Sequence, residues 1–147
     1  MERTFAKRIL AFLLFGILSC AEQEPLDFCS DPIGADTYSA ENGNWICFLP
    51  DINGCFIFQS SSTPSITSIA VTGHTRGTIA ATGQASCLGE VLEKPSSGYA
   101  SSVEAKPGYG YVVKFPDNTY ARFYIVSVEK NASGAVTRIN MTRQYSF

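Results

Sequence analysis

Cysteine and histidine are the residue types in this chain with the most specific chemistry. The sequence of 147 residues contains one histidine, His74, which lies in a predicted turn at Thr72–Thr75. A single histidine excludes a two-histidine metal site and a His-Glu-x-x-His helix. Zinc sites built from cysteine usually contain pairs separated by two to four residues. We expect no metal site because that spacing is absent among Cys29, Cys47, Cys55 and Cys87.

The acidic and hydroxyl residues show no catalytic pattern. Glu90 and Glu93 are close in sequence, but nothing places them across a cleft as glycoside hydrolysis requires. No Gly-x-Ser-x-Gly sequence supports a serine nucleophile. Asp51–Gly54 begins like a calcium loop but lacks the glutamate that completes one. We therefore predict a protein that is not an enzyme, with no catalytic residue and no cofactor.

The N-terminus has the regions of an export signal. Arg3, Lys7 and Arg8 precede an apolar run of ten residues, Ile9–Leu18. A helix of ten residues is about 15 Å long, about half the thickness of a bilayer core. The run is therefore too short for a permanent membrane span and has the length of a signal peptide's apolar region.

Ile17-Leu18-Ser19-Cys20 closes this signal and resembles the lipobox of bacterial lipoproteins. The resemblance implies cleavage before Cys20, a diacylglyceryl group on its sulfur and anchoring in the cell envelope, most simply the outer membrane. Residues 1–19 are then a cleaved signal peptide and residues 20–27 an acidic tether. Acids directly after the cysteine resemble the surface-export signals of Bacteroidetes lipoproteins, although the face of the membrane stays open. The alternative is an ordinary secretory signal with a chance cysteine.

An exported chain with four further cysteines is expected to contain two disulfides. Three connectivities of Cys29, Cys47, Cys55 and Cys87 are possible, and the sequence does not select one. Cys47 and Cys55 would face one another across a hairpin centred on Asp51. A two-residue turn at Asn53-Gly54 would set another register and separate them.

Charge is distributed unevenly along the chain. Removal of residues 1–19 takes three basic residues and one acid from totals of 11 and 13, which leaves a net charge of −4. This acidity argues against a nucleic-acid partner, which needs a basic face. Seven acids and no lysine or arginine lie between positions 20 and 60. This acidic front is a solvated spacer, a cation-binding surface or the partner of the basic C-terminal half.

The rest of the sequence predicts an all-β fold. Short β-branched and aromatic runs are interrupted by Gly, Pro, Asn and Asp, without a sustained helical period. We expect a small antiparallel sandwich or barrel-like domain over residues 28–147, with an N-terminal hairpin region at 28–60 and a β module at 66–147. Turns at Pro116–Asn118 and Asn131–Gly134 predict a C-terminal three-stranded meander. The predicted strands are Trp45–Leu49, Cys55–Gln59, Ile66–Val71, Gly77–Ala81, Tyr109–Phe115, Thr119–Val128 and Ala135–Arg143.

The predicted strand Thr119–Val128 carries apolar residues at both parities. One parity holds Tyr120, Tyr124 and Val126, and the other holds Phe123 and Ile125. Side chains alternate between the two faces of a sheet, so this strand is expected to be central and covered on both sides. Arg122 interrupts the first set, and we expect it at the solvent-exposed rim.

The C-terminal half contains a series of segments with a recognisable pattern, namely Cys87–Val91, Pro95–Ala100, Pro107–Val113, Tyr120–Val126 and Arg143–Phe147. With these segments, residues 66–147 resemble C-terminal β modules of uncharacterised Bacteroidetes lipoproteins. The resemblance implies a β architecture and an envelope location, and it implies no activity. The loop at Glu129–Gly134 departs from the family, in which a Gly-Gly turn is common.

Tyrosines suggest a binding role, since six of the seven lie between Tyr99 and Tyr145. Tyrosine rings stack on apolar ligand faces while their hydroxyls stay solvated. Tyr99, Tyr109 and Tyr111 are the candidate ligand-stacking residues, and Tyr99 and Tyr109 are expected to be the most exposed. We predict a lipid-anchored, non-catalytic binding or structural module for a glycan, peptide or envelope protein. The alternatives are a small secreted hydrolase and an inhibitor-like disulfide domain that presents Phe48–Gly54.

Overall fold

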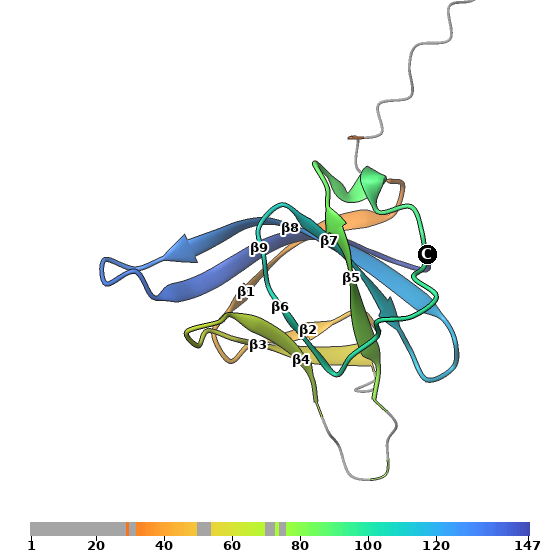
Figure 1. Ribbon diagram of the computed structural model, residues 1–147, viewed down its shortest axis with the longest axis horizontal. Helices are drawn as coiled ribbons and strands as arrows, with labels where there is room; N and C mark the ends of the chain where they lie inside the picture. Colours follow the sequence, from red (N-terminus) through yellow and green to blue (C-terminus); the bar gives the residue numbers. More distant parts are fainter. Residues whose placement is uncertain (1–28, 30–31, 50–53, 70–72, 74–75) are drawn as a thin grey trace, which may run out of the picture.

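The domain is a sandwich of two antiparallel β-sheets, which confirms the all-β prediction (Figure 1). The computed structural model describes residues 29, 32–49, 54–69, 73 and 76–147. The five-stranded sheet has the order β1-β9-β8-β7-β5, and the four-stranded sheet has the order β2-β3-β4-β6. No helix among the described residues is long and apolar enough to span a membrane. The strands are β1 Ala35–Glu41, β2 Trp45–Cys47, β3 Cys55–Gln59, β4 Ser65–Ser68, β5 Thr78–Gln84, β6 Ser102–Glu104, β7 Tyr109–Lys114, β8 Tyr120–Lys130 and β9 Val136–Tyr145.

The predicted C-terminal meander is present, because β8 pairs with β7 on one side and β9 on the other. Its first turn has Asn118 at a φ of 64°, and Asp117 accepts hydrogen bonds from the backbone and hydroxyl of Thr119. These bonds to the carboxylate lower the pKa of Asp117. In the second turn the Asn131 side chain accepts bonds from the backbone of Ser133 and Ala135. The loop at Glu129–Gly134, which differs from the family pattern, therefore forms its turn without a Gly-Gly pair.

Two strands, β1 and β6, were not predicted from the sequence, and both pair with strands that are distant in the sequence. β1 pairs with β9 along its whole length, with Asp36 opposite Arg143 and Glu41 opposite Arg138. β6 pairs with β4. The described part of residues 28–60 thus contributes strands to both sheets and side chains to the same core as residues 66–147.

The two sheets are also linked at their edges, which gives the sandwich a barrel-like closure. Ile79 of β5 and Ala100 exchange two backbone hydrogen bonds of 2.9 Å just before β6. At the opposite edge a tight turn joins β1 to β2, and Gly43 donates to the carbonyl of Phe58. Strand edges that would otherwise be open are thereby partly protected.

Aromatic rings fill the space between the sheets. Phe48 contacts Phe56, Phe115 and Phe123 with ring centroids 5.7 to 6.4 Å apart. Tyr111 stacks on Phe123 at 4.7 Å. Side chains of this size each bury a large apolar area, and such pairs add a specific geometry to the burial. The inner core therefore fixes how the sheets face one another.

The outer face of the five-stranded sheet is covered by residues 85–94, here called the outer cover. It contains a short 3-10 helix, η2, at Leu88–Glu90. Leu88 and Val91 are buried against Val112 of β7. Gly110 permits this approach, since a Cβ there would collide with the side chains of Val91 and Thr82. The expectation that β8 is central and covered on both sides is thus confirmed.

Arg122 lies beneath the outer cover, so its predicted position at the solvent-exposed rim is wrong. Its residue is only 9% exposed. One guanidinium nitrogen donates to the carbonyl of Val91 at 2.6 Å, and another donates to the Gln144 side chain at 2.8 Å. The Phe147 ring lies 4.5 Å from the guanidinium carbon. Burial lowers the pKa of Arg122, and these partners replace its lost hydration.

Part of the acidic front pairs with the basic C-terminal half, which was one of the three possibilities. Asp36 lies 3.0 Å from Arg143, and Glu41 lies 2.6 Å from Arg138. Arg143 also donates to the carbonyl of Cys47 and lies over the Tyr38 ring. These contacts join β1, β2 and β9.

Replacement of Arg122 by alanine tests whether it fastens the outer cover. Arg122→Ala removes the partner of the buried Val91 carbonyl and the stacking on Phe147, so we expect a loss of about 2–4 kcal/mol in the free energy of unfolding. Arg138→Ala is the control, because its half-exposed ion pairs are expected to contribute less than about 1 kcal/mol. Urea denaturation measures both. Equal losses would contradict the assignment.

Candidate functional site

The main concave feature of the described residues is a cleft at one end of the sandwich, below the β8–β9 hairpin. It consists of two adjoining cavities of about 740 and 500 Å³, here together called the end cleft. Ser60, Ala135 and Val136 line both cavities. The larger one is also lined by Ser61, Ser62, Pro64, Glu104, Ala105, Lys106, Pro107, Val128, Lys130 and Gly134.

The larger cavity of the end cleft borders the part of β8 that extends beyond its neighbour β7. Their pairing ends at Tyr109 and Ile125, whereas β8 continues to Lys130. Residues 126–130 therefore have a strand partner, β9, on one side only. The projecting hairpin is visible in blue at the left of Figure 1. Its unpartnered side borders the larger cavity at Val128 and Lys130.

Tyr111 holds the opposite wall of the end cleft from inside the core. Its hydroxyl donates to the carbonyl of Glu104 at 2.8 Å and accepts from the backbone N–H of Lys106 at 2.9 Å. The residue is 1% exposed, so its predicted role as a ligand-stacking ring is wrong. Burial raises the pKa of Tyr111 to about 12. Its contribution to the site is the position of Glu104 and Lys106.

The other two candidate tyrosines do not form a common exposed surface with it. Tyr99 packs in the outer cluster around Leu88, and its hydroxyl is buried without a hydrogen-bond partner among the described residues. This burial, together with the nearby Tyr120, raises the pKa of Tyr99. Tyr109 packs against the inner core with the Lys106 ammonium 5.6 Å from its ring centre. The sequence did not indicate how deeply these tyrosines are buried. Both faces of the sheet are covered, so the alternation of residues along a strand does not separate buried from exposed side chains.

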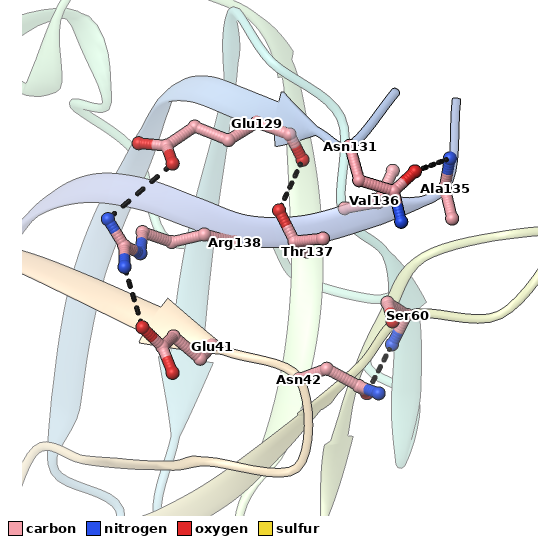
Figure 2. A pocket seen from close by; sticks show the side chains of 9 residues that line it. All are labelled: Glu41, Asn42, Ser60, Glu129, Asn131, Ala135, Val136, Thr137 and Arg138. Carbon is pink, nitrogen blue, oxygen red and sulfur yellow. Dashed lines mark hydrogen bonds and ion pairs between the residues drawn. The ribbon is translucent and has the colours of Figure 1, made fainter. Parts of the chain in front are cut away.

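Charges in the smaller cavity of the end cleft are paired with one another (Figure 2). Arg138 lies 2.6 Å from Glu41 and 3.5 Å from Glu129. The hydrogen bond that Arg138 donates to Glu41, together with the negative charges of Glu129 and Glu41, raises the pKa of Arg138. The side chains of Glu41 and Glu129 are 60% and 47% exposed. A general acid at neutral pH needs a desolvated carboxyl, and this pair does not provide one.

Two amide side chains shape the rim of the smaller cavity. The Asn42 oxygen accepts from the backbone N–H of Ser60 at 2.9 Å. The Asn131 oxygen closes the hairpin turn, as Figure 2 shows for its bond to Ala135. Asn42 thereby joins the β1–β2 turn to the loop after β3. The rim is held by polar contacts between segments distant in the sequence.

Cys47 and Cys55 form a disulfide across the β2–β3 hairpin. They are register partners, which settles the hairpin alternative in favour of the one centred on Asp51. The loop proposed for an inhibitor is closed by this bond, but positions 50–53 lie outside the described residues. Sequence reasoning missed Trp45, which is exposed on the outer face of the same hairpin beside Ile57.

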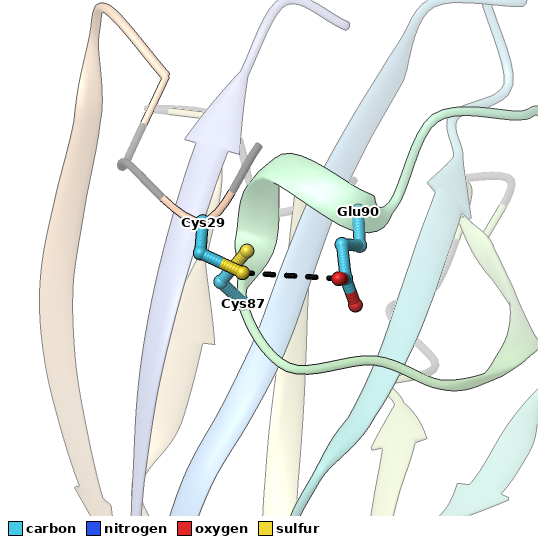
Figure 3. Close-up of side chains that lie close together, drawn as sticks. All are labelled: Cys29, Cys87 and Glu90. Carbon is cyan, nitrogen blue, oxygen red and sulfur yellow. Dashed lines mark hydrogen bonds between the residues drawn. The ribbon is translucent and has the colours of Figure 1, made fainter. Parts of the chain in front are cut away.

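Cys29, Cys87 and Glu90 meet at the outer cover (Figure 3). Their two sulfur atoms and one carboxylate oxygen all lie within 4.8 Å of one another. The Cys29 thiol donates to Glu90 at 3.7 Å, and the other Glu90 oxygen accepts from the backbone of Ser86 at 2.6 Å. The hydrogen bond with Cys87, then burial and the charges of Cys87 and Glu90, raise the pKa of Cys29 to about 12.

Two residues singled out from the sequence lie outside the described residues. These are Cys20, the predicted lipid-attachment site, and His74. The signal peptide at 1–19 and the tether at 20–27 lie outside them as well. Their chemistry stays a prediction from the sequence.

Removal of the Tyr111 hydroxyl tests its role in holding the wall. Tyr111→Phe leaves the Glu104 carbonyl and the Lys106 N–H unpaired, so we expect a loss of about 1–3 kcal/mol in the free energy of unfolding at pH 8. Tyr109→Phe is the control and is expected to change it by less than about 0.5 kcal/mol. Urea denaturation measures both variants.

Tyr111→Phe should also change how the free energy of unfolding depends on pH. The pKa of Tyr111 is about 12 in the folded chain against an ordinary value of 10.0. The unfolded chain therefore loses this proton first, and stability declines as pH rises from 10 to 12. Tyr111→Phe should make this decline shallower. An unchanged alkaline slope would contradict burial of the hydroxyl.

Comparisons with protein-family models, with curated proteins and with solved structures find no match to this chain. Its function therefore has to be inferred from its own residues and geometry.

Proposed function

We propose that the chain is a lipid-anchored, non-catalytic binding module of the bacterial cell envelope, which takes an extended segment of a partner protein into its end cleft. The observation that carries the proposal is that the larger cavity, about 740 Å³, is lined by Val128 and Lys130, in the part of β8 that has no partner on the β7 side. An extended segment can add to such a side as a further strand through main-chain hydrogen bonds.

The lining of the end cleft favours a polypeptide. Val128, Val136 and Pro64 offer apolar contacts next to the open strand side, which suits the alternating side chains of an added strand. Glu104 and Lys106 form an ion pair of 2.9 Å on the opposite wall. Lys130 lies at the end of β8 and is not in an ion pair with any described residue. An acidic side chain on the incoming segment would complement it.

Binding without catalysis is the simplest use of these groups. The carboxylates of Glu41 and Glu129 both contact Arg138 and remain well hydrated. Neither carboxylate is desolvated as a general acid would be, and neither is positioned as a base beside a nucleophile. The same groups do stabilise the hairpin that forms one wall of the end cleft.

Anchoring is supported by the N-terminal sequence. The basic residues, the apolar run and the Ile17–Cys20 lipobox follow one another in the order of a lipoprotein signal. Each acyl CH₂ buried in the membrane contributes roughly 0.8 kcal/mol, and two or more chains make anchoring stable. The acidic tether at residues 20–27 then separates the membrane from the domain.

Substitution of the lipid-attachment residue tests the anchor. Cys20→Ser removes the acceptor sulfur, so the chain should incorporate no labelled palmitate and should leave the membrane fraction of bacterial cells. Ser19→Ala keeps a small residue before the cysteine and should be acylated and retained. Acylation is measured by label incorporation and location by fractionation. Retention of Cys20→Ser in the membrane would refute the lipid anchor.

Selection of peptides on the full chain tests the end cleft. Peptides from a random library displayed on phage should be captured by the purified lipoprotein in detergent. Ala135→Trp places an indole where both cavities meet, and binding should weaken at least about tenfold. Ala132→Trp is the matched control, because Ala132 is exposed in the same turn but lines neither cavity, and it should bind normally.

Three results would argue against a peptide in the end cleft. Binders that tolerate Ala135→Trp use another surface. Binding on a glycan array, lost in Ala135→Trp, would assign the end cleft to sugars. Hydrolysis of a captured peptide would favour the hydrolase alternative.

A further inference from the structure

Two cysteines that are distant in the sequence lie together on the outer cover. Cys29 is exposed and Cys87 is buried, and their sulfur atoms lie within 4.8 Å of one another. Figure 3 shows both side chains converging beside η2, with Glu90 next to them. The arrangement brings the beginning of the domain onto the segment that covers the five-stranded sheet.

We propose that Cys29 and Cys87 form a second disulfide, which fastens the beginning of the domain to the outer cover. A protein or low-molecular-weight disulfide is the oxidant. One cysteine thiolate attacks it and releases a thiol, and the second cysteine sulfur then attacks the first, forming the Sγ–Sγ bond and releasing another thiol. The two cysteines lose two electrons and two protons, which the oxidant gains. In the cell, formation rests on the envelope location proposed above.

Proximity and the state of the other cysteines support the bond. Cys47 and Cys55 are already joined in the same chain, and exported proteins commonly have all such cysteines oxidised. The two sulfurs lie within 4.8 Å of one another and have to approach to about 2 Å for the bond to form. Oxidation also removes two ionisable thiols from the neighbourhood of the Glu90 carboxylate.

A metal ion is a weaker occupant of the same cluster. Binding through Cys29, Cys87 and Glu90 would place three negative charges within 4.8 Å before the metal enters. The Cys29 pKa of about 12 opposes the second thiolate. Structural zinc sites also use four ligands, and the cluster among the described residues has three.

The bond would change how the anchor holds the domain. Cys29 follows Cys20 by nine positions, which an extended chain spans in about 30 Å. Tension from the membrane would pass through the disulfide into the outer cover, which Arg122 and Leu88 attach to the middle of the five-stranded sheet. Without the bond, the same tension would act first on the edge strand β1.

Peptide mapping of the full chain tests the pairing. The chain is reduced, reoxidised in a buffer of oxidised and reduced glutathione, alkylated, and digested with trypsin and a glutamate-specific protease. Cleavage after Glu22, Glu41, Arg76 and Glu90 yields fragments 23–41, 42–76 and 77–90, which separate Cys29 and Cys87 from the pair Cys47 and Cys55. We expect 23–41 joined to 77–90, and 42–76 with an internal disulfide.

Alkylated Cys29 and Cys87 in this material would overturn the proposal, as would a bond from either to Cys47 or Cys55. Reduced cysteines with stoichiometric bound zinc would replace it with a metal site. The chain isolated from cells under alkylating conditions tests the location separately. A bond formed in the glutathione buffer but absent in cells supports the pairing and contradicts the oxidising envelope location.

Thermal unfolding gives a second measurement. Cys29→Ser and Cys87→Ser should each lower Tm by on the order of 10 °C without reductant, and the double variant should lose no more than either single one. Additive losses would contradict a shared bond. The peptide mapping uses the unmodified sequence and stays decisive if a variant fails to fold.

Discussion

The structure depends on one requirement, that β8 be covered on both faces. Its inner face carries Ala121, Phe123 and Ile125, which are buried against the four-stranded sheet. Its outer face carries Tyr120, Arg122 and Tyr124, which a solvated sheet would leave in water. The outer cover meets this requirement with very few residues, because Leu88 and Val91 supply the apolar contact and the Val91 carbonyl accepts from Arg122. A buried guanidinium with paired donors then acts as a specific connection between two segments that have no strand pairing.

The two halves of β8 have different surroundings. The outer cover contacts the first half of the strand, where Lys94 also lies over the rings of Tyr120 and Phe147. The second half, beyond Ile125, projects past β7 and leaves a strand side bordered by the end cleft. The proposed attachment uses Cys29 and Cys87 on the outer cover, and the proposed binding surface borders the second half of β8. Cys29, Cys87 and Glu90 line neither cavity of the end cleft, so a ligand there and a tether on the outer cover would use different residues.

Sequence reasoning succeeded where the signal is local. The strands rich in β-branched and aromatic residues, the turns at Asn118 and Asn131, and the all-β class follow from periodicity and turn chemistry. It failed where burial depends on a segment from elsewhere. β1 has few apolar residues because it is an edge strand, and β6 is only three residues long. Tyr111 and Arg122 were placed wrongly because nothing in strand parity says that residues 85–94 cover the outer face or that an inward-pointing hydroxyl finds backbone partners.

The least predictable contacts are those that hold the beginning of the domain. Asp36 and Arg143 are 107 positions apart, and Glu41 and Arg138 are 97 apart, so only the pairing of β1 with β9 brings them together. Their exposed carboxylates limit what each ion pair contributes to stability, which is typically below about 1 kcal/mol. β1 is thus held by its ladder with β9 and by weak charge pairs. If the domain is anchored through its N-terminus as proposed, unfolding under tension would start at β1, whereas a bond between Cys29 and Cys87 would pass the tension to the outer cover.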